Sequence, residues 1–186
     1  MGGSGGTSDH TTGPSPPTAL ANFHGMAYWL LKSEPESFGY ADLVAVKREG
    51  WDGIRSFQAR NHLREMRKGD QAIFYHSNAK PPGAAGICKV VKGPEPDPTQ
   101  FEPTSKYYDP TSDRDDPRWD WVTVAPVRAL EFVSLDELKL LPELADSRLT
   151  ARGNRLSVLP LTADEFDAIV RAADAKKRAG RKPSPT

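Results

Sequence analysis

A stretch of thirteen residues near the middle of the chain joins an apolar strand to a stiff, polar loop. It runs from Phe74 to Gly86 and ends in Pro81-Pro82-Gly83 and three small residues. The two prolines hold the backbone extended, and Gly83 lets it turn without a side-chain clash. The segment therefore predicts a strand whose end and loop form the floor and lip of a pocket. The alternative is a plain hairpin with a proline-stiffened loop.

Polar side chains stand where this strand ends. His76, Ser77 and Asn78 follow the apolar run directly, and Pro82 lies at the lip of the loop. Short hydrogen-bonding groups fixed at a strand end can read the edge of a ligand. We expect these residues to face the pocket. For His76 the alternative is a histidine at the edge of the core that hydrogen-bonds the backbone.

Composition limits the class of protein. The 186 residues suit one domain with tails, and 25 basic residues balance 25 acidic ones. A polyanionic partner would therefore need a local basic patch. The single cysteine, Cys88, rules out an internal disulfide and is expected in the core. No apolar run is long enough to cross a bilayer and no signal peptide is evident, so we expect a soluble intracellular protein without a membrane partner.

Both ends of the chain differ from its middle. Residues 1–25 are rich in Gly, Ser, Thr and Pro, and residues 173–186 are basic and contain Gly and Pro. Such segments bury too little apolar surface to offset the entropy of ordering. The sequence predicts two disordered tails around a folded domain of residues 26–172.

Strands and short helices alternate within that domain. Two boxes of the Ser/Thr-x-x-Glu type, Ser134 with Glu137 and Thr162 with Glu165, predict helix starts. The loop of residues 92–118 is too long for a simple connection, so we expect it to fold over another part of the domain. The predicted class is α+β, with a curled mixed sheet approaching a barrel and flanked by short helices. The expected strands are 28–32, 71–76, 86–91, 119–132 and 155–160, and the expected helices are 40–48, 57–67, 135–140 and one after Thr162.

Familiar cofactor motifs are missing from the sequence. It has no P-loop, dinucleotide fingerprint, zinc-ligand pair or nucleophile elbow, and its four histidines are scattered. We therefore expect neither a cofactor nor a metal. The four tryptophans are more informative, because an indole is costly to expose without a purpose. Trp29 and Trp119 are the candidate pocket walls, and Trp51 is expected to be a packing residue.

Hydrogen-bond donors cluster before and within the second predicted helix. Arg55, Gln58, Arg60 and Asn61 lie within two turns, where free backbone N–H groups also favour an anion or an acceptor. Lys32 and Ser33 follow the first strand, and Arg155 and Ser157 belong to the last strand. This distribution suits a planar, hydrogen-bond-rich ligand or a phosphate.

Together these motifs closely resemble the EVE domain family over residues 27–170. The resemblance rests on the segments Tyr28–Pro35, Trp51–Arg55, Gln58–Asn61, Phe74–Asn78, Pro81–Gly83, Asp97–Phe101, Tyr107–Pro110, Pro117–Trp119 and Arg155–Val158. It implies a PUA-like fold, related to the YTH readers of methylated adenosine, and recognition of modified bases in DNA or RNA. Ser56-Phe57 departs from the Asn-Tyr of many relatives, which puts the preferred base in question.

The resemblance and the residues suggest one mechanism. A reader flips a modified base, such as 5-methyl- or 5-hydroxymethylcytosine, out of the duplex and stacks it on aromatic side chains. We expect Ser33, Ser77 and Asn78 to read the base edge and the arginines to hold the backbone or rim. The predicted ligand-binding set is Trp29, Lys32, Ser33, Arg55, Ser56, Gln58, Arg60, Asn61, His76, Ser77, Asn78, Pro82, Trp119, Arg155 and Ser157.

Three alternatives to a DNA reader remain open. They are a reader of modified RNA like the YTH domains, an ASCH-like amidohydrolase that uses Lys32 and Glu34 for proton transfer, and a scaffold for a partner protein. DNA is expected over RNA, the chain is expected to be monomeric, and no catalysis is expected. The high Ala, Pro, Asp and Arg usage suggests a bacterial, cytoplasmic protein, with a nuclear location if the source is eukaryotic.

Overall fold

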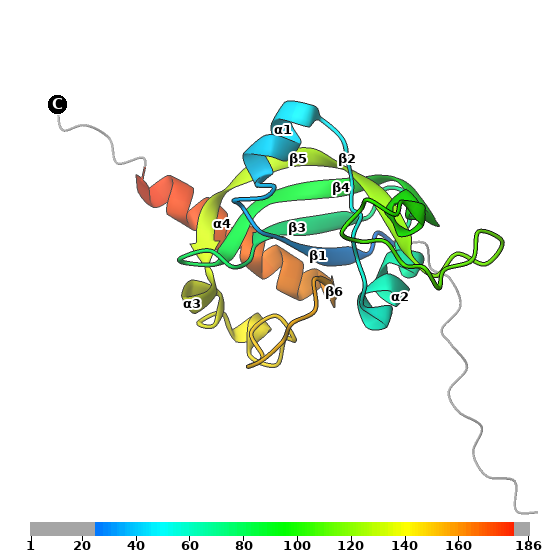
Figure 1. Ribbon diagram of the computed structural model, residues 1–186. Helices are drawn as coiled ribbons and strands as arrows, with labels where there is room; N and C mark the ends of the chain where they lie inside the picture. Colours follow the sequence, from blue (N-terminus) through cyan, green and yellow to red (C-terminus); the bar gives the residue numbers. More distant parts are fainter. Residues whose placement is uncertain (1–24, 181–186) are drawn as a thin grey trace, which may run out of the picture.

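The computed structural model describes residues 25–180, whose strands form one strongly curved six-stranded sheet (Figure 1). The strand order is β2-β5-β4-β3-β1-β6. β1 and β3 run parallel, and the other neighbouring pairs are antiparallel. The sheet stays open, with β2 and β6 at its edges, so the predicted curled mixed sheet is confirmed without closure into a barrel. The strands are β1 (Tyr28–Ser33), β2 (Glu49–Gly50), β3 (Gln71–His76), β4 (Gly83–Pro96), β5 (Asp120–Ser134) and β6 (Val158–Leu161).

Helices cover both faces of this sheet. They are α1 (Tyr40–Val46), α2 (Phe57–Glu65), α3 (Leu135–Leu138) and α4 (Ala163–Gly180), with 3-10 turns η1 (Pro98–Phe101) and η2 (Pro142–Leu144). Alternate residues of β1 point to opposite faces. Trp29 and Leu31 pack in the core under α1 and α2, whereas Leu30 packs in the core under α3 and α4. Both clusters consist of buried residues, one on each face of the sheet.

Asp70 fixes the start of β1 against β3. Its buried carboxylate accepts hydrogen bonds from the indole Nε1 of Trp29 at 3.0 Å and from the backbone nitrogens of Ala27 and Arg67 at 3.1 and 2.9 Å. A buried carboxylate is tolerated when its oxygens are paired in this way. Asp70 therefore ties the segment before β3 to the start of β1, at one end of their six-residue parallel ladder.

The two predicted capping boxes are confirmed. Ser134 and Glu137 exchange hydrogen bonds at the start of α3, and Thr162 and Glu165 do so ahead of α4. Each pair satisfies two N–H groups that the first helical turn leaves free.

Residues 173–180, predicted to begin a disordered tail, are ordered. α4 continues without interruption to Gly180, so residues 173–180 are helical. Lys176 within this extension donates to the Phe132 carbonyl at 2.6 Å and to Glu137 Oε1 at 2.8 Å. These contacts lie far away in sequence, which is why a local reading of the basic composition missed them. The rest of the two predicted tails, residues 1–24 and 181–186, lies outside the described residues.

No helix within residues 25–180 has the length and apolar character required to cross a membrane.

Gly86 is required by the packing of Tyr40. A Cβ at residue 86 would lie 2.2 Å from the Tyr40 ring, which is buried edge-on against Phe74 and donates its hydroxyl to the Ile87 carbonyl at 2.8 Å. Gly86→Ala should therefore lower the free energy of unfolding by about 1–3 kcal/mol, measured by urea denaturation. Gly25→Ala is the control, because nothing lies within 4 Å of its added Cβ. Equal stability of the two variants would contradict this account of the packing.

Candidate functional site

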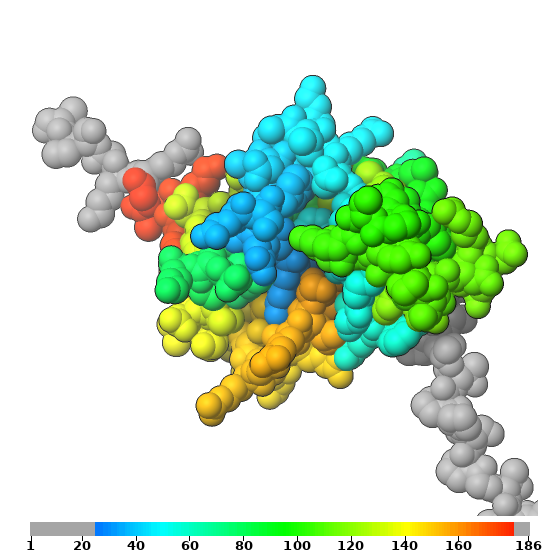
Figure 2. Space-filling model, viewed as in Figure 1, coloured from blue at the N-terminus to red at the C-terminus, as the bar shows by residue number. Residues whose placement is uncertain are grey.

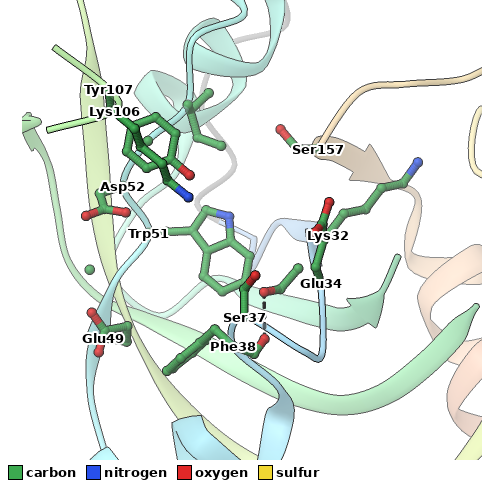
Figure 3. Close-up of a pocket in the computed structure, with 14 residues that line it drawn as sticks. Lys32, Glu34, Ser37, Phe38, Glu49, Trp51, Asp52, Lys106, Tyr107 and Ser157 are labelled. Carbon is green, nitrogen blue, oxygen red and sulfur yellow. Dashed lines mark hydrogen bonds between the residues drawn. The ribbon is translucent and has the colours of Figure 1, made fainter. Parts of the chain in front are cut away.

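A cavity of about 460 Å³ opens at the carboxyl end of β1. In the space-filling view the surface is hollowed where the blue, cyan, green and orange segments meet (Figure 2). The close-up shows that each of these segments contributes side chains to the lining of the cavity (Figure 3). The walls are Lys32, Ser33, Glu34, Ser37, Phe38, Glu49, Gly50, Trp51, Asp52, Gly53, Ile54, Lys106, Tyr107 and Ser157. A volume of this size is typical of sites for small ligands.

Trp51 forms the central aromatic wall of the cavity. Its ring is packed edge-on against Phe74, with centroids 5.4 Å apart at 86°, and its backbone nitrogen donates to the Val122 carbonyl at 2.7 Å. Its indole N–H has no hydrogen-bond partner among the described residues and borders the open space of the cavity (Figure 3). Phe38 and Tyr107 supply two further aromatic rings. The cavity therefore offers apolar faces together with an unused donor.

Tyr107 reaches the cavity because Arg55 holds its loop. Arg55 donates from Nε and Nη2 to the Tyr107 carbonyl at 2.8 and 2.5 Å, and its guanidinium lies 5.5 Å from the Tyr107 ring centroid. Gly53 has a φ of 71°, and a Cβ there would lie 2.5 Å from that ring. Glycine at this position thus permits both the left-handed backbone and the close approach of Tyr107.

Asp97 anchors both sides of this contact. Its fully buried carboxylate accepts from Gly53 N at 3.0 Å, from Arg55 Nη1 at 2.8 Å, and from the Thr99 nitrogen and hydroxyl at 2.8 and 2.6 Å. Burial alone would raise the pKa of Asp97, but the hydrogen bonds from Thr99, Arg55 and Gly53 outweigh it and lower the pKa below the ordinary 3.8. The segment 51–55 and the loop after β4 are thereby joined.

Charged groups surround the aromatic walls. Three carboxylates, those of Glu34, Glu49 and Asp52, line the cavity with two ammonium groups, those of Lys32 and Lys106. Desolvation raises the pKa of Asp52, and the neighbouring Asp97 and Glu49 carboxylates raise it further. Burial lowers the pKa of Lys32. The cavity is therefore richer in hydrogen-bond acceptors than in cationic donors.

Three of the predicted ligand-binding residues line this cavity. They are Lys32, Ser33 and Ser157. The Ser33 hydroxyl donates to the Phe38 carbonyl at 2.6 Å, and the backbone nitrogen of Lys32 donates to the Ser157 carbonyl at 2.8 Å. The end of β1 and the segment before β6 thus form one continuous wall.

The two tryptophans predicted as pocket walls lie elsewhere. Trp29 is a core residue whose indole N–H is bonded to Asp70, and it does not line this cavity. Trp119 is buried against Phe57, with ring centroids 4.9 Å apart, and donates from Nε1 to Asp109 Oδ2 at 2.7 Å. It stabilises the base of the loop after β4. Trp51, predicted to be a packing residue, packs on Phe74 and also lines the cavity.

The residues predicted at the end of β3 also miss the cavity. His76 Nε2 accepts from the backbone nitrogen of Tyr40 at 3.1 Å, which matches the alternative of a core-edge histidine, and burial lowers the pKa of His76. Ser77 extends the pairing with β1 through bonds from its nitrogen and hydroxyl to the Ser33 carbonyl at 2.8 and 3.2 Å. Asn78 is exposed in a turn with a φ of 50°, and the Pro82 carbonyl accepts from Leu135 N at 2.8 Å.

The predicted donor cluster around α2 is divided. Arg55 uses its donors within the protein, as described above. The Ser56 hydroxyl caps α2 by accepting from Ala59 N at 3.4 Å. Arg60 donates to the Arg118 carbonyl at 3.0 Å and to the side chain of Asn61 at 2.7 Å. Gln58 and Arg155 meet in a separate groove beside the cavity.

Several cavity residues were absent from the predicted set. They are Glu34, Ser37, Phe38, Glu49, Gly50, Trp51, Asp52, Gly53, Ile54, Lys106 and Tyr107. Segments 51–55 and 107–110 were recognised as motifs, but no local pattern indicates that they face each other. The signal available was the length of the loop after β4, which brings Tyr107 back to Gly53.

The fold and this cavity define a member of the EVE domain family. The family model described as EVE domain matches residues 27–172, and the chain belongs to this family. Thymocyte nuclear protein 1 from mouse is 46% identical over 163 residues, covering 77% of this chain and 72% of that protein. The human protein of the same name is 44% identical over 164 residues, with the same two coverages.

Solved structures agree with this assignment. A crystal structure of human thymocyte nuclear protein 1 in complex with DNA containing 5-methylcytosine has a TM-score of 0.76 and 41% identity, covering 84% of this chain and 99% of that chain. A protein from Leishmania major has a TM-score of 0.78 and 41% identity, covering 83% and 98%. The YTH domain of Mmi1 has a TM-score of 0.52 at 13% identity, covering 84% and 79%, and shares the fold alone.

The buried ion pair below the cavity should control its stability. Asp97→Asn removes the charge opposite Arg55, and we expect it to lower the free energy of unfolding by about 3 kcal/mol at neutral pH. Because the pKa of Asp97 is lowered in the folded chain, its contribution is complete above 3.8 and fades as the pH falls through the folded value. Urea denaturation at neutral pH and below pH 3.8 should show the difference from the wild type shrinking in acid.

The matched control is Asp174→Asn. Asp174 forms a 2.9 Å pair with Arg128 in which both side chains are about two-fifths exposed, so the loss should stay below about 1 kcal/mol. A loss at Asp97 as small as this one would show that the buried pair does not hold the site.

Proposed function

We propose that this protein is a non-enzymatic reader that binds a modified base of DNA in the cavity described above. The observation that carries the proposal is a ligand-sized cavity walled by Trp51, Phe38 and Tyr107. Beside it lies the indole N–H of Trp51, which has no partner within residues 25–180. The 5-methylcytosine DNA complex of a 41% identical relative supports the choice of ligand. A modified cytosine, flipped out of the duplex, is the proposed occupant.

The energy of flipping is compatible with this cavity. Unstacking and unpairing a base costs a few kcal/mol, and stacking on an aromatic side chain returns about 1–3 kcal/mol per base. Trp51 is held rigidly by Phe74, so little side-chain entropy is lost when a base stacks on it. Hydrogen bonds at the base edge supply the remaining selectivity.

The polar lining favours a base that carries an amino group. Ionised carboxylates are pure acceptors, and Glu34, Glu49 and Asp52 present three of them to the cavity. Asp and Glu are the side chains that accept from the N4 amino group of cytosine. Thymine presents a carbonyl oxygen at the same position, which these carboxylates would repel. We therefore assign the cavity to cytosine-type bases.

An amidohydrolase activity is less favoured than base reading. Catalysis by Lys32 and Glu34 would need the two side chains together, but the Lys32 chain extends away from Glu34 (Figure 3) and its Nζ donates to the Asn154 carbonyl at 3.4 Å. Incubation with N4-acetylcytidine followed by chromatography should leave the nucleoside intact. Turnover that is lost in Lys32→Ala would establish the enzymatic alternative.

DNA is favoured over RNA as the partner. The support is the 5-methylcytosine DNA complex of the human relative, whereas the likeness to the YTH domain concerns the fold. The curated relatives carry a nuclear name, which supports the nuclear alternative rather than the cytoplasmic expectation. We propose that the protein binds as a monomer, because one chain supplies all walls of the cavity.

Removal of the Trp51 ring should abolish base selectivity. Trp51→Ala deletes the central wall, and we expect the ratio of affinities for methylated and unmethylated duplexes to fall by about tenfold, because stacking is worth about 1–3 kcal/mol. Fluorescence anisotropy with labelled duplexes measures this ratio. Trp29→Phe is the matched control, which should lower stability through the lost bond to Asp70 but keep the ratio. If the ratio fell in Trp29→Phe and was kept in Trp51→Ala, Trp29 and not Trp51 would contact the base.

Asp52 should discriminate between 5-methylcytosine and thymine. The two bases share a C5 methyl group and differ in the amino or carbonyl group that faces the acceptors. In duplexes where either base lies in a mismatch, the wild type should prefer 5-methylcytosine by about tenfold, and Asp52→Asn should reduce that preference. Since the pKa of Asp52 is raised, Asp52 becomes protonated at a higher pH than an ordinary carboxyl. The wild-type preference for 5-methylcytosine should therefore decline at that higher pH. An unchanged preference in the variant would remove Asp52 from the base edge.

A further inference from the structure

A second groove lies beside the cavity and is lined by arginines. It has a volume of about 340 Å³ and is formed by Gln58 of α2 and by the loop between η2 and β6. Its walls are Gln58, Arg148, Ala151, Arg152, Gly153, Asn154, Arg155 and Leu156. The orange loop that carries the three arginines is seen below the hollow in the space-filling view (Figure 2).

The three guanidinium groups of the groove are uncompensated. Arg148, Arg152 and Arg155 are exposed, and none forms an ion pair within residues 25–180. Another arginine-lined groove on the molecule differs in this respect, since its Arg64 and Arg118 are paired with Asp120 and Asp109. In a chain with no net charge, the first groove is therefore a local positive patch.

The groove and the cavity share a wall. Lys32 lines the cavity, and its Nζ donates to the carbonyl of Asn154, which lines the groove, at 3.4 Å. Ser157 of the cavity follows Arg155 and Leu156 of the groove in sequence. Asn154 also fixes its own loop, because its side-chain nitrogen donates to the Arg148 carbonyl and its side-chain oxygen accepts from Leu156 N at 3.0 Å. The groove therefore adjoins the cavity on the side of Lys32 and Ser157.

We propose that this groove binds a backbone phosphate of the DNA strand whose flipped base occupies the cavity. This step rests on the function proposed above. Arginine matches phosphate with a planar fork of donors, and phosphate contacts fix the register of a strand without reading its sequence. Gln58 supplies a neutral donor at the opposite wall of the groove. The groove thus orients the strand, while the cavity reads the base.

The salt dependence of DNA binding tests this assignment. Anisotropy titrations at several potassium chloride concentrations use duplexes with and without a single 5-methylcytosine, and the variants Arg152→Gln, Arg155→Gln and Arg148→Gln. Each variant that loses a phosphate contact should weaken both duplexes by the same factor, about three- to tenfold, and flatten the slope of log K against log salt by about 0.9. The ratio between the two duplexes should stay unchanged.

The matched control is Arg178→Gln. Arg178 is also exposed and belongs to the last turn of α4, whose end lies away from the loop between η2 and β6 (Figure 1). The Arg178→Gln variant should leave the DNA affinity and the slope of log K against log salt unchanged. Groove variants that bind like the wild type, or a control that loses as much as they do, would overturn the proposal.

A second measurement locates the phosphate. Duplexes that carry a neutral methylphosphonate at one position next to the modified base are bound by the wild type and by Arg152→Gln and Arg155→Gln. If one phosphate occupies the groove, its neutralisation should weaken the wild type and have a smaller effect in a groove variant, which is the signature of a coupled pair. Equal losses in all proteins at every position would contradict the assignment.

The two proposals fail in different ways. If the wild type shows no preference for the methylated duplex, the cavity is not a base reader, and the salt slopes alone still decide whether the arginines contact phosphate. If the preference is present but the groove variants keep the wild-type slope, the reader stands and the phosphate site is wrong.

Discussion

The carboxylate of Asp97 is the contact on which the site depends. It is fully buried at the end of β4 and bonds to Gly53, Arg55 and Thr99, so it joins the segment after β2 to the loop after β4. Arg55, oriented by the same carboxylate, holds the Tyr107 carbonyl, and Gly53 gives the Tyr107 ring room. One wall of the cavity is thus attached to the other through a single charged group. A buried carboxylate without these donors would be strongly destabilising, so the loop and the segment fold together.

Much of the fold followed from local patterns in the sequence. Gln71–His76 was predicted to the residue, because an apolar run between Gly69-Asp70 and a polar turn is a strong strand signal. The boxes at Ser134 and Thr162 marked true helix starts, since the contacts that make them lie within three residues. The far end of α4 was missed because its support comes from Phe132 and Glu137, about forty residues away. Barrel closure depends on which strands become edges, and no local pattern encodes that.

The site was harder to predict because identical residue types have different partners. Trp29, Trp51 and Trp119 all lie near strand ends, and from their positions we predicted Trp29 and Trp119 as pocket walls and Trp51 as a packing residue. The structure separates them by the hydrogen bonding of the indole N–H. That of Trp29 donates to Asp70, and that of Trp119 donates to Asp109. Both acceptors lie in other segments of the chain, and in the described residues the Trp51 N–H has none. The proposed ligand-binding indole is distinguished by the lack of a structural partner among the described residues, and such a feature is visible only in three dimensions.

The distribution of charge explains how a chain with no net charge could bind a polyanion such as DNA. Carboxylates of Glu34, Glu49 and Asp52 line the cavity, so a phosphate entering it would be repelled, whereas a neutral base with amino groups would be accepted. Next to it, the guanidinium groups of Arg148, Arg152 and Arg155, which form no ion pair among the described residues, attract phosphate. The two surfaces meet at Lys32, whose amine contacts the Asn154 carbonyl. A strand can satisfy both only when a base points into the cavity and its backbone remains outside, which is the geometry of a flipped nucleotide.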